Sequence, residues 1–87
     1  MKKLSKYRIC GNVETTISGK LMYLILIDIC DRKGEIIIPQ RKISEVLHIS
    51  KTTVSRNLRR LERIGCISII PQYNIYGGRD PNKYILR

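Results

Sequence analysis

The sequence is poor in the residues that metal sites, disulfide frameworks and aromatic binding surfaces require. It has no tryptophan and no phenylalanine, and its five tyrosines are scattered. This composition argues against a module that stacks RNA bases on aromatic side chains. One histidine, His48, and three distant cysteines, Cys10, Cys30 and Cys66, form no zinc-ligand pattern. We therefore expect no metal site, and reduced, mostly buried thiols as in a cytosolic protein.

Long apolar runs and acidic residues are scarce as well. The most apolar run, residues 21–30, is half as long as the ~20 residues of a membrane span, and Asp28 interrupts it. The basic start of the chain is not followed by the apolar stretch of a signal peptide. Seven acidic residues oppose 17 lysines and arginines, which gives a net charge of +10. Such a charge attracts polyanions, and DNA, RNA and anionic membranes are the candidates.

A chain of 87 residues, 43% of them hydrophobic, is expected to form one domain with its own core. We divide it into a basic segment of uncertain structure at residues 1–16 and a folded domain at residues 17–87. Catalysis is not expected, because no serine or cysteine has a base and an orienting group nearby in the sequence, and His48 falls in a predicted turn. No cofactor site or small-molecule ligand is evident.

Two helices are predicted in the first half of the domain. The first covers residues 19–32, with Thr16 or Ser18 as its N-cap and a stop at residues 33–34. Residues 35–38 form a short strand that Pro39 ends, and residues 40–47 form the second helix. The residues of this second helix that should face inward are Ile43, Val46 and Leu47.

A third helix is predicted at residues 51–64, after a turn at residues 48–50. Ser50 is a favourable N-cap and Gly65 a favourable stop. The apolar residues recur at spacings of four, three and three, so one side of the helix carries Val54, Leu58, Leu61 and Ile64. The opposite face carries Thr52, Arg56, Arg59 and Arg63, flanked on one side by Lys51 and Ser55 and on the other by Thr53, Asn57 and Arg60.

This polar face has the chemistry of a helix that enters the major groove of DNA. An arginine can bond both O6 and N7 of a guanine, and hydroxyl groups can reach phosphates or base edges. The N-terminus of a helix also favours phosphate. For this helix taken alone, a merely solvated basic face is the alternative interpretation.

The residues after the third helix predict a β-hairpin. Residues 67–70 form a strand that Pro71 closes, residues 72–82 form a turn-rich loop, and residues 84–86 form the returning strand. The segment 35–38 is expected to add a third strand. A hairpin directly after the second helix of a helix-turn-helix is a wing, with Arg79 at its tip and Lys83 near its base. Both are placed to meet phosphates or a minor groove.

Together these motifs carry a family resemblance. Residues 43–67, ISEVLHISKTTVSRNLRRLERIGCI, resemble the winged helix-turn-helix signature of bacterial regulators. The ending GGRDPNKYIL at residues 77–86 is similar to a subgroup common in phage, plasmid and mobile-element proteins. The resemblance covers residues 17–86. It implies an α+β winged helix with a three-helix core and a small antiparallel sheet that forms one wing.

The resemblance also implies roles for individual residues, in which Lys51, Thr52 and Arg56 face bases while Thr53, Ser55 and the wing face phosphates. The hydroxyl of Ser55 can serve either purpose. Combining the helix face with the resemblance, we expect base contacts from Lys51, Thr52, Ser55, Arg56 and Arg59. We expect phosphate contacts from Ser50, Thr53, Arg60, Arg63, Arg79 and Lys83.

The function we expect is sequence-specific binding of double-stranded DNA, as a cytoplasmic, nucleoid-associated transcriptional regulator of bacterial or phage origin. The alternatives are a phage- or plasmid-type replication initiator, a winged-helix protein-interaction module that binds no DNA, and an RNA-binding protein. A homodimer through the helix at residues 21–30 is a further prediction, because nine of these ten residues are apolar. A stripe of Leu21, Leu24, Ile25 and Cys30 would suffice to pack this helix on a core.

Overall fold

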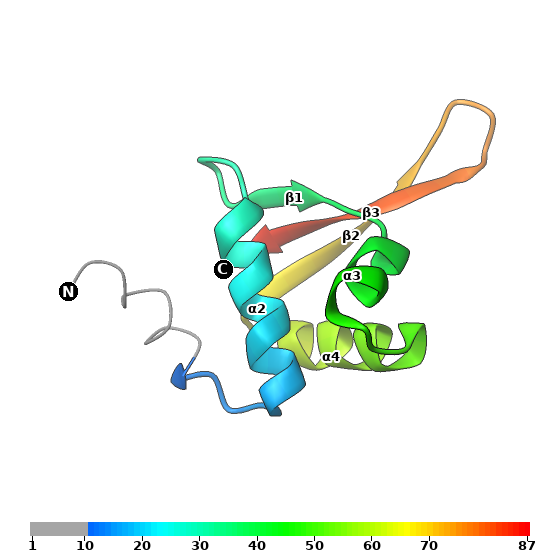
Figure 1. The fold of residues 1–87 in the computed structure, drawn as a ribbon. Helices are drawn as coiled ribbons and strands as arrows, with labels where there is room; N and C mark the ends of the chain where they lie inside the picture. Colours follow the sequence, from blue (N-terminus) through cyan, green and yellow to red (C-terminus); the bar gives the residue numbers. More distant parts are fainter. Residues whose placement is uncertain (1–10) are drawn as a thin grey trace.

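The computed structural model describes residues 11–87, so most of the predicted basic segment at residues 1–16 lies outside the described residues. Within the described part, the chain forms three helices and one three-stranded antiparallel sheet (Figure 1). The predicted α+β architecture is thereby confirmed. In chain order the elements are α2 (Ile17–Ile29), β1 (Glu35–Ile37), α3 (Gln40–Leu47), α4 (Lys51–Arg63), β2 (Ile67–Tyr73) and β3 (Arg79–Leu86).

The sheet has the strand order β1-β3-β2, so β1 joins the hairpin as its third strand, as predicted. Tyr84 in the central strand pairs with Ile36 on one side and Ile69 on the other. Alternate residues of a strand point to opposite faces. Because Ile36, Ile67 and Tyr84 are buried, their face of the sheet is the one that meets the helices.

The hairpin strands are longer than the sequence suggested. Proline was expected to end the first strand, but β2 continues through Pro71 to Tyr73, and β3 begins at Arg79. Proline lacks a backbone N–H and is tolerated on an edge strand, where no partner needs that donor. β2 is such an edge strand, and its register with β3 shifts between Ile70 and Gln72.

The core lies where α2, α4 and the inner face of the sheet meet. In α4 the side chains of Val54, Leu58 and Leu61 are fully buried, as the predicted stripe requires. The remaining buried hydrophobic residues are Met22, Tyr23, Leu26, Ile36, Ile43, Ile67 and Tyr84. The core therefore fixes which side of α4 is left for solvent.

Two predicted inward positions in α3 and α4 were wrong. Val46 in α3 is 60% exposed. The other two residues that were expected to face inward from α3 do so, since Ile43 is buried and Leu47 packs against the edge of the core. Ile64 is also exposed, because α4 ends at Arg63 and Ile64 is its C-cap. A helix end departs from the regular 100° step, so periodicity fails at its last residue.

The predicted inward stripe of α2 was wrong in part, since Leu24 and Cys30 pack against the core but Leu21 does not. The buried residues are Gly19, Met22, Tyr23 and Leu26, whereas Leu21 is 47% exposed. The predicted flank position of Asn57 in α4 must be corrected as well, because its side chain is buried. The two corrections have one cause, which is that α2 packs against α4. The buried amide of Asn57 faces the start of α2, where it accepts a hydrogen bond from the Thr16 hydroxyl at 3.0 Å.

The helix caps follow the sequence closely. Thr16 caps α2 by accepting a hydrogen bond from the Gly19 amide, and Ser50 caps α4 by accepting one from the Thr53 amide, both at 3.1 Å. Gly65 adopts the left-handed backbone (φ 86°) that ends α4. His48 takes a left-handed conformation (φ 54°) in the turn between α3 and α4. α2 starts two residues earlier than predicted and stops at Ile29, because Cys30 is extended.

The thiols are less buried than predicted. Cys30 and Cys66 are free and half-buried, and Cys10 lies outside the described residues. Partial burial raises the pKa of the Cys66 thiol, because the charged thiolate would lose hydration.

Candidate nucleic-acid interface

α4 presents a row of polar side chains on the side opposite its buried residues. Since α4 is anchored by its apolar stripe, the face about 180° away must point to solvent. This face and its flank form one wall of an open hollow on the protein surface. The residues that line the hollow are Gln40, Lys51, Thr52, Ser55, Arg56, Arg59 and Arg63. All five residues that we expected to contact bases are among them.

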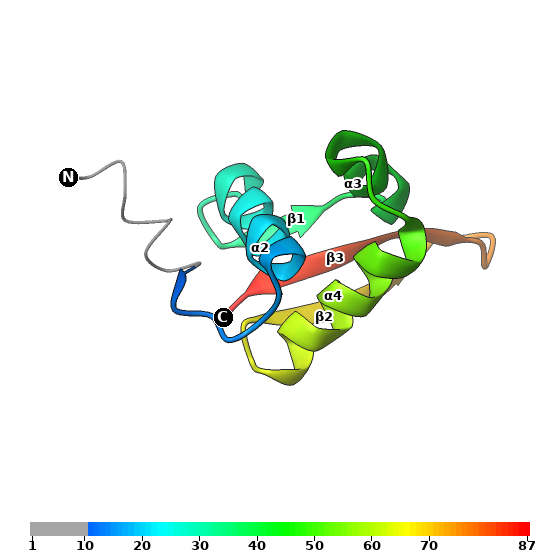
Figure 2. The same ribbon diagram turned by 60° about the horizontal axis from the view of Figure 1, so that its bottom comes forward.

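A second hollow continues from the first toward the hairpin. It shares Gln40, Ser55 and Arg59 with the first hollow. The remaining lining residues come from α4 and from both hairpin strands: Leu58, Glu62, Ile69, Pro71, Arg79 and Asn82. Figure 2 shows α4 and the hairpin side by side, with the end of the hairpin extending past the helices. The helix and the hairpin thus border one continuous concave surface.

Glu62 holds the hairpin against α4. Its carboxylate accepts a hydrogen bond at 2.9 Å from the backbone N–H of Ile69 in β2. Because β2 is an edge strand, this amide has no strand partner on that side. The bond gives this edge amide a partner and ties β2 to the last turn of α4. The sequence did not predict this role of Glu62. Its only indication is that Glu62 lies near the end of the helix, just before the hairpin.

α4 carries many more positive than negative charges. Its cations are Lys51, Arg56, Arg59, Arg60 and Arg63, against the single acid Glu62. At the N-terminus of α4 the first backbone amides have no carbonyl partner within the helix, apart from the Thr53 amide that Ser50 caps, and the hydroxyls of Ser50 and Thr53 share a hydrogen bond of 2.9 Å. A helix N-terminus and a row of guanidinium groups both attract phosphate. The surface is therefore built to hold a polyanion.

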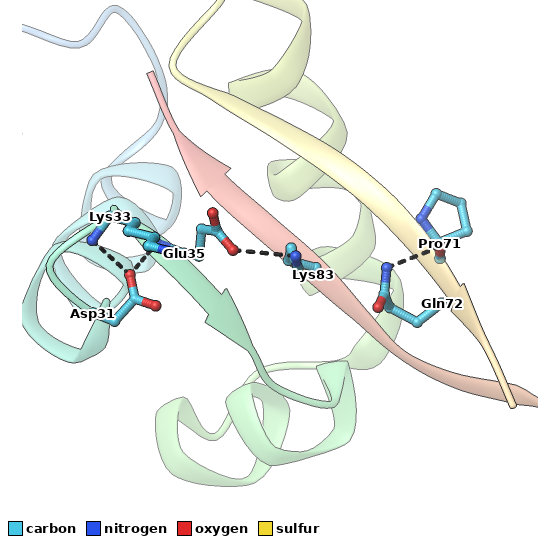
Figure 3. Close-up of polar contacts among 6 residues, drawn as sticks. All are labelled: Asp31, Lys33, Glu35, Pro71, Gln72 and Lys83. Carbon is cyan, nitrogen blue, oxygen red and sulfur yellow. Dashed lines mark hydrogen bonds and ion pairs between the residues drawn. The ribbon is translucent and has the colours of Figure 1, made fainter.

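The structure does not bring every predicted contact residue to this surface. Arg60 is half-buried and lines neither hollow, because it is turned by about 100° from Arg59 around the helix. Lys83 points to the outer face of the sheet, since its neighbour Tyr84 points inward. There its ammonium group pairs with the Glu35 carboxylate at 3.1 Å (Figure 3).

Arg79 occupies a different place from the one predicted. It was expected at the tip of the wing but is the first residue of β3, opposite Tyr73. Its guanidinium donates to the Asn82 side-chain oxygen at 3.1 Å and lines the second hollow. The reason is that the strands run further than predicted, so the tip consists of the residues between Tyr73 and Arg79.

Gln40 and Asn82 are lining residues that the sequence did not single out. They come from the start of α3 and from β3, and they meet only in the folded chain. Beside their side-chain amides lies the Tyr84 hydroxyl, which is fully buried and forms no hydrogen bond of good geometry. Burial raises the pKa of Tyr84, against the opposing effects of the two amides and of Arg79, so the hydroxyl keeps its proton and can donate it.

In residues 11–87, no group of three or more histidine, cysteine or acidic side chains could hold a metal ion. The same stretch contains no helix with the length and apolar character to cross a membrane.

The fold and the concave surface define a class of protein: a helix-turn-helix formed by α3 and α4, followed by a wing formed by β2 and β3. Comparison with known families agrees. A family model described as winged helix-turn-helix DNA-binding matches residues 37–68, from the end of β1 through both helices into β2. The winged helix-turn-helix resemblance seen in the sequence is thereby confirmed for these residues, and the match supports DNA binding. Comparisons with curated proteins and with solved structures found no significant match.

Proposed function

We propose that the chain recognises specific duplex DNA sequences with α4 in the major groove, and that it regulates transcription as a cytoplasmic, nucleoid-associated protein of bacterial or phage origin. The observation that carries this proposal is that five side chains suited to base contacts line the same hollow: Lys51, Thr52, Ser55, Arg56 and Arg59. An α-helix with its side chains is about 10–12 Å across and the major groove is about 12 Å wide, so α4 can lie in the groove with its exposed face toward the bases.

Within this proposal the lining residues divide by their chemistry. Arg56 and Arg59 read guanine, and Gln40 is placed to bond adenine through its amide. The phosphate contacts fall to Arg63 and Arg79, which line the hollows, and to residues of α4 and its cap that lie beside the hollows without lining them: Ser50, Thr53 and Arg60. Lys83 is left out of the proposed contact set, because its charge is already paired on the outer face of the sheet.

Salt dependence tests the electrostatic part of the proposal. If about six phosphates are neutralised, the logarithm of the binding constant should fall against log salt with a slope near −5 on duplex DNA. Single-stranded DNA and a hairpin RNA of matched length serve as competitors, measured by fluorescence anisotropy at two salt concentrations. Equal affinity for the RNA hairpin, or a slope near zero on the duplex, would contradict the proposal.

Two arginine variants separate base recognition from phosphate anchoring. Arg56→Ala should weaken binding to a preferred duplex by about 1–3 kcal/mol and relax its sequence preference. Arg79→Ala should weaken preferred and scrambled duplexes by a similar factor, because its guanidinium lies at the wing side of the surface. Arg32→Ala is the matched control, since it removes the same charge from the loop after α2. A reversed pattern would mean that the two roles are exchanged.

We further propose that two copies associate through α2. On this helix Ile17 is 79% exposed, and Leu21 lies one turn further along and is also exposed. A two-fold dimer would present two α4 helices to half-sites about 34 Å apart and would cover these side chains. Sedimentation equilibrium should show a dimer that Leu21→Glu converts to monomer. A monomer mass for the unmodified chain, with and without DNA, would exclude this arrangement.

A further inference from the structure

The tip of the β2–β3 hairpin, residues 74–78, differs from the rest of the wing in its chemistry. Ile75 is 91% exposed and Tyr76 is 90% exposed. No charged residue lies between Tyr73 and Arg79, although the chain as a whole carries a net charge of +10. In both views the tip extends beyond the helices (Figures 1 and 2). Two adjacent apolar side chains therefore stand at the most projecting part of the hairpin.

The tip has a defined conformation, which Asn74 closes. The side-chain oxygen of Asn74 accepts hydrogen bonds from the backbone amides of Tyr76 at 2.9 Å and Gly78 at 3.0 Å. The Asn74 N–H also donates to the Gly78 carbonyl at 2.8 Å, and Gly77 supplies the left-handed turn with φ 82°. A loop held in this way presents its side chains with little ordering entropy left to lose on binding.

We propose that this tip is a wedge that inserts Ile75 and Tyr76 into the minor groove of DNA, separates a base step and bends the duplex. Aliphatic side chains inserted between base pairs partly unstack them and kink the helix, and an aromatic ring can stack on an exposed base. This inference rests on the proposed function, because it requires that α4 occupies the neighbouring major groove.

The dimensions of the hairpin fit this placement. Pro71 and Arg79 line the hollow beside α4, and Ile75 lies four residues beyond Pro71, which is about 13 Å along an extended strand. The Tyr76 side chain extends outward from the backbone and adds to this reach. The major and minor grooves on one face of DNA are about half a helical turn apart, about 17 Å. With α4 in the major groove, Arg79 would lie at the intervening phosphates and the tip would reach the minor groove.

The absence of charge at the tip supports a wedge over a phosphate contact. Phosphates are bound by cations, hydroxyls and backbone amides, and in residues 74–78 the Asn74 side chain already occupies two of the amides. The floor of the minor groove presents base edges and sugars, against which apolar side chains can be buried. Pyrimidine–purine steps such as TA unstack most easily, so we expect one at a fixed distance from the site of α4.

A double variant tests the wedge directly. The probe is a duplex that the unmodified chain selects from a random pool, labelled at both ends for resonance energy transfer. Ile75→Ser combined with Tyr76→Ser should abolish most of the bend and weaken binding about tenfold. The slope against log salt should stay unchanged, because no cation is removed. Ile37→Ser, at an isoleucine that is 59% exposed on the outer face of the sheet, is the matched control and should alter neither quantity.

A fluorescent reporter gives an independent measurement. The chain has no tryptophan, so Tyr76→Trp places the only indole at the tip. Its emission should be quenched as the selected duplex saturates the protein, while Ile37→Trp should show no such quenching. Both variants change exposed positions, so their folding should be unaffected.

The outcomes distinguish this inference from the function on which it rests. If the unmodified chain selects no duplex, the proposed function and the wedge fail together. If it binds a duplex that stays straight, or if the double variant bends DNA as the unmodified chain does, the wedge alone is overturned. Loss of self-association in the double variant, with DNA bending unchanged, would also overturn it and would assign the tip to a protein contact.

Discussion

α2 and α4 are helices of equal length, 13 residues each, that pack against each other and have opposite compositions. α4 carries five cations and buries its apolar residues along a single stripe. α2 has one lysine and one aspartate, Lys20 and Asp28, and its other side chains are mostly apolar on every side. A helix with one apolar stripe can be docked in only one orientation, so its polar face points in a defined direction. A helix that is apolar all round takes its orientation from its neighbours.

The largest expected effect on stability comes from two neighbouring residues of α2, and it tests that difference. Met22 is fully buried and Leu21 is exposed, although both are large and apolar. Met22→Ala should lower the free energy of unfolding by about 2–5 kcal/mol, through lost burial and the cavity left behind. Leu21→Ala should cost less than about 1 kcal/mol in the monomer.

Urea denaturation at two protein concentrations measures both variants. The penalty of Met22→Ala should be independent of concentration, whereas that of Leu21→Ala should grow with concentration if α2 joins two copies. A larger penalty for Leu21→Ala than for Met22→Ala at low concentration would mean that α2 presents the opposite side to the core.

This contrast also explains which parts of the structure the sequence predicted. Ser50, Gly65 and the buried stripe of α4 were all identified, because capping and a strong periodicity are local properties of the chain. The inward side of α2 was not identified, because Leu21 and Met22 are both large and apolar and the sequence does not show which of them faces α4 and the sheet. Asn57 was assigned to the surface for the same reason, because its partner Thr16 is 41 residues away.

The wing shows the same limit. Its existence and its third strand were predicted from alternating apolar residues and turn residues. The extent of its strands was not, because an edge position is a property of the sheet and decides whether Pro71 is tolerated. The strand lengths then decide that Arg79 lies beside α4 and that Ile75 and Tyr76 stand at the tip. The contacts of Lys83 depend likewise on Glu35 in a different strand.

The N-caps of the two helices allow a second, smaller test. Ser50 bonds only within the first turn of α4, whereas the Thr16 hydroxyl caps α2 and also donates to the buried Asn57. Ser50→Ala should therefore cost about 1 kcal/mol of stability, the usual value of a cap. Thr16→Ala should cost about 2 kcal/mol, because it also leaves a buried amide oxygen without its donor.

Thermal denaturation of the free protein compares these caps, with Thr16→Ser as the control that keeps the hydroxyl. Thr16→Ser should recover most of the stability that Thr16→Ala loses. If Thr16→Ala and Ser50→Ala were equally destabilising, the bond between Thr16 and Asn57 would contribute nothing beyond the cap.

The segments that follow the C-terminal ends of the two helices give the smallest expected effect on stability, and this effect depends on pH. α4 ends in the left-handed Gly65, whereas after α2 the chain turns around the Asp31 carboxylate. One oxygen of Asp31 accepts hydrogen bonds from the backbone amides of Glu35 at 2.9 Å and Lys33 at 2.8 Å (Figure 3). The hydrogen bond from the Glu35 amide is the main cause that lowers the pKa of Asp31. Desolvation is the next largest effect and opposes it, while the Lys33 amide and the charges of Lys33 and Lys83 lower the pKa further.

A lowered pKa in the folded state means that the ionised carboxylate stabilises the fold above the pKa of the unfolded chain, which is about 3.9. This contribution is lost as the pH falls through the lower folded value. Asp31→Asn removes the charge but keeps an acceptor oxygen, so the stability difference from the unmodified chain should be constant above about pH 5 and shrink below pH ~4. Gly65→Ala is the control, because its penalty comes from backbone strain at φ 86° and should be the same at both ends of a titration followed by urea denaturation. If the Asp31→Asn difference were as large at pH 3 as at pH 7, the exit of α2 would depend on the shape of the side chain and not on its charge, and the two helix exits would then be alike.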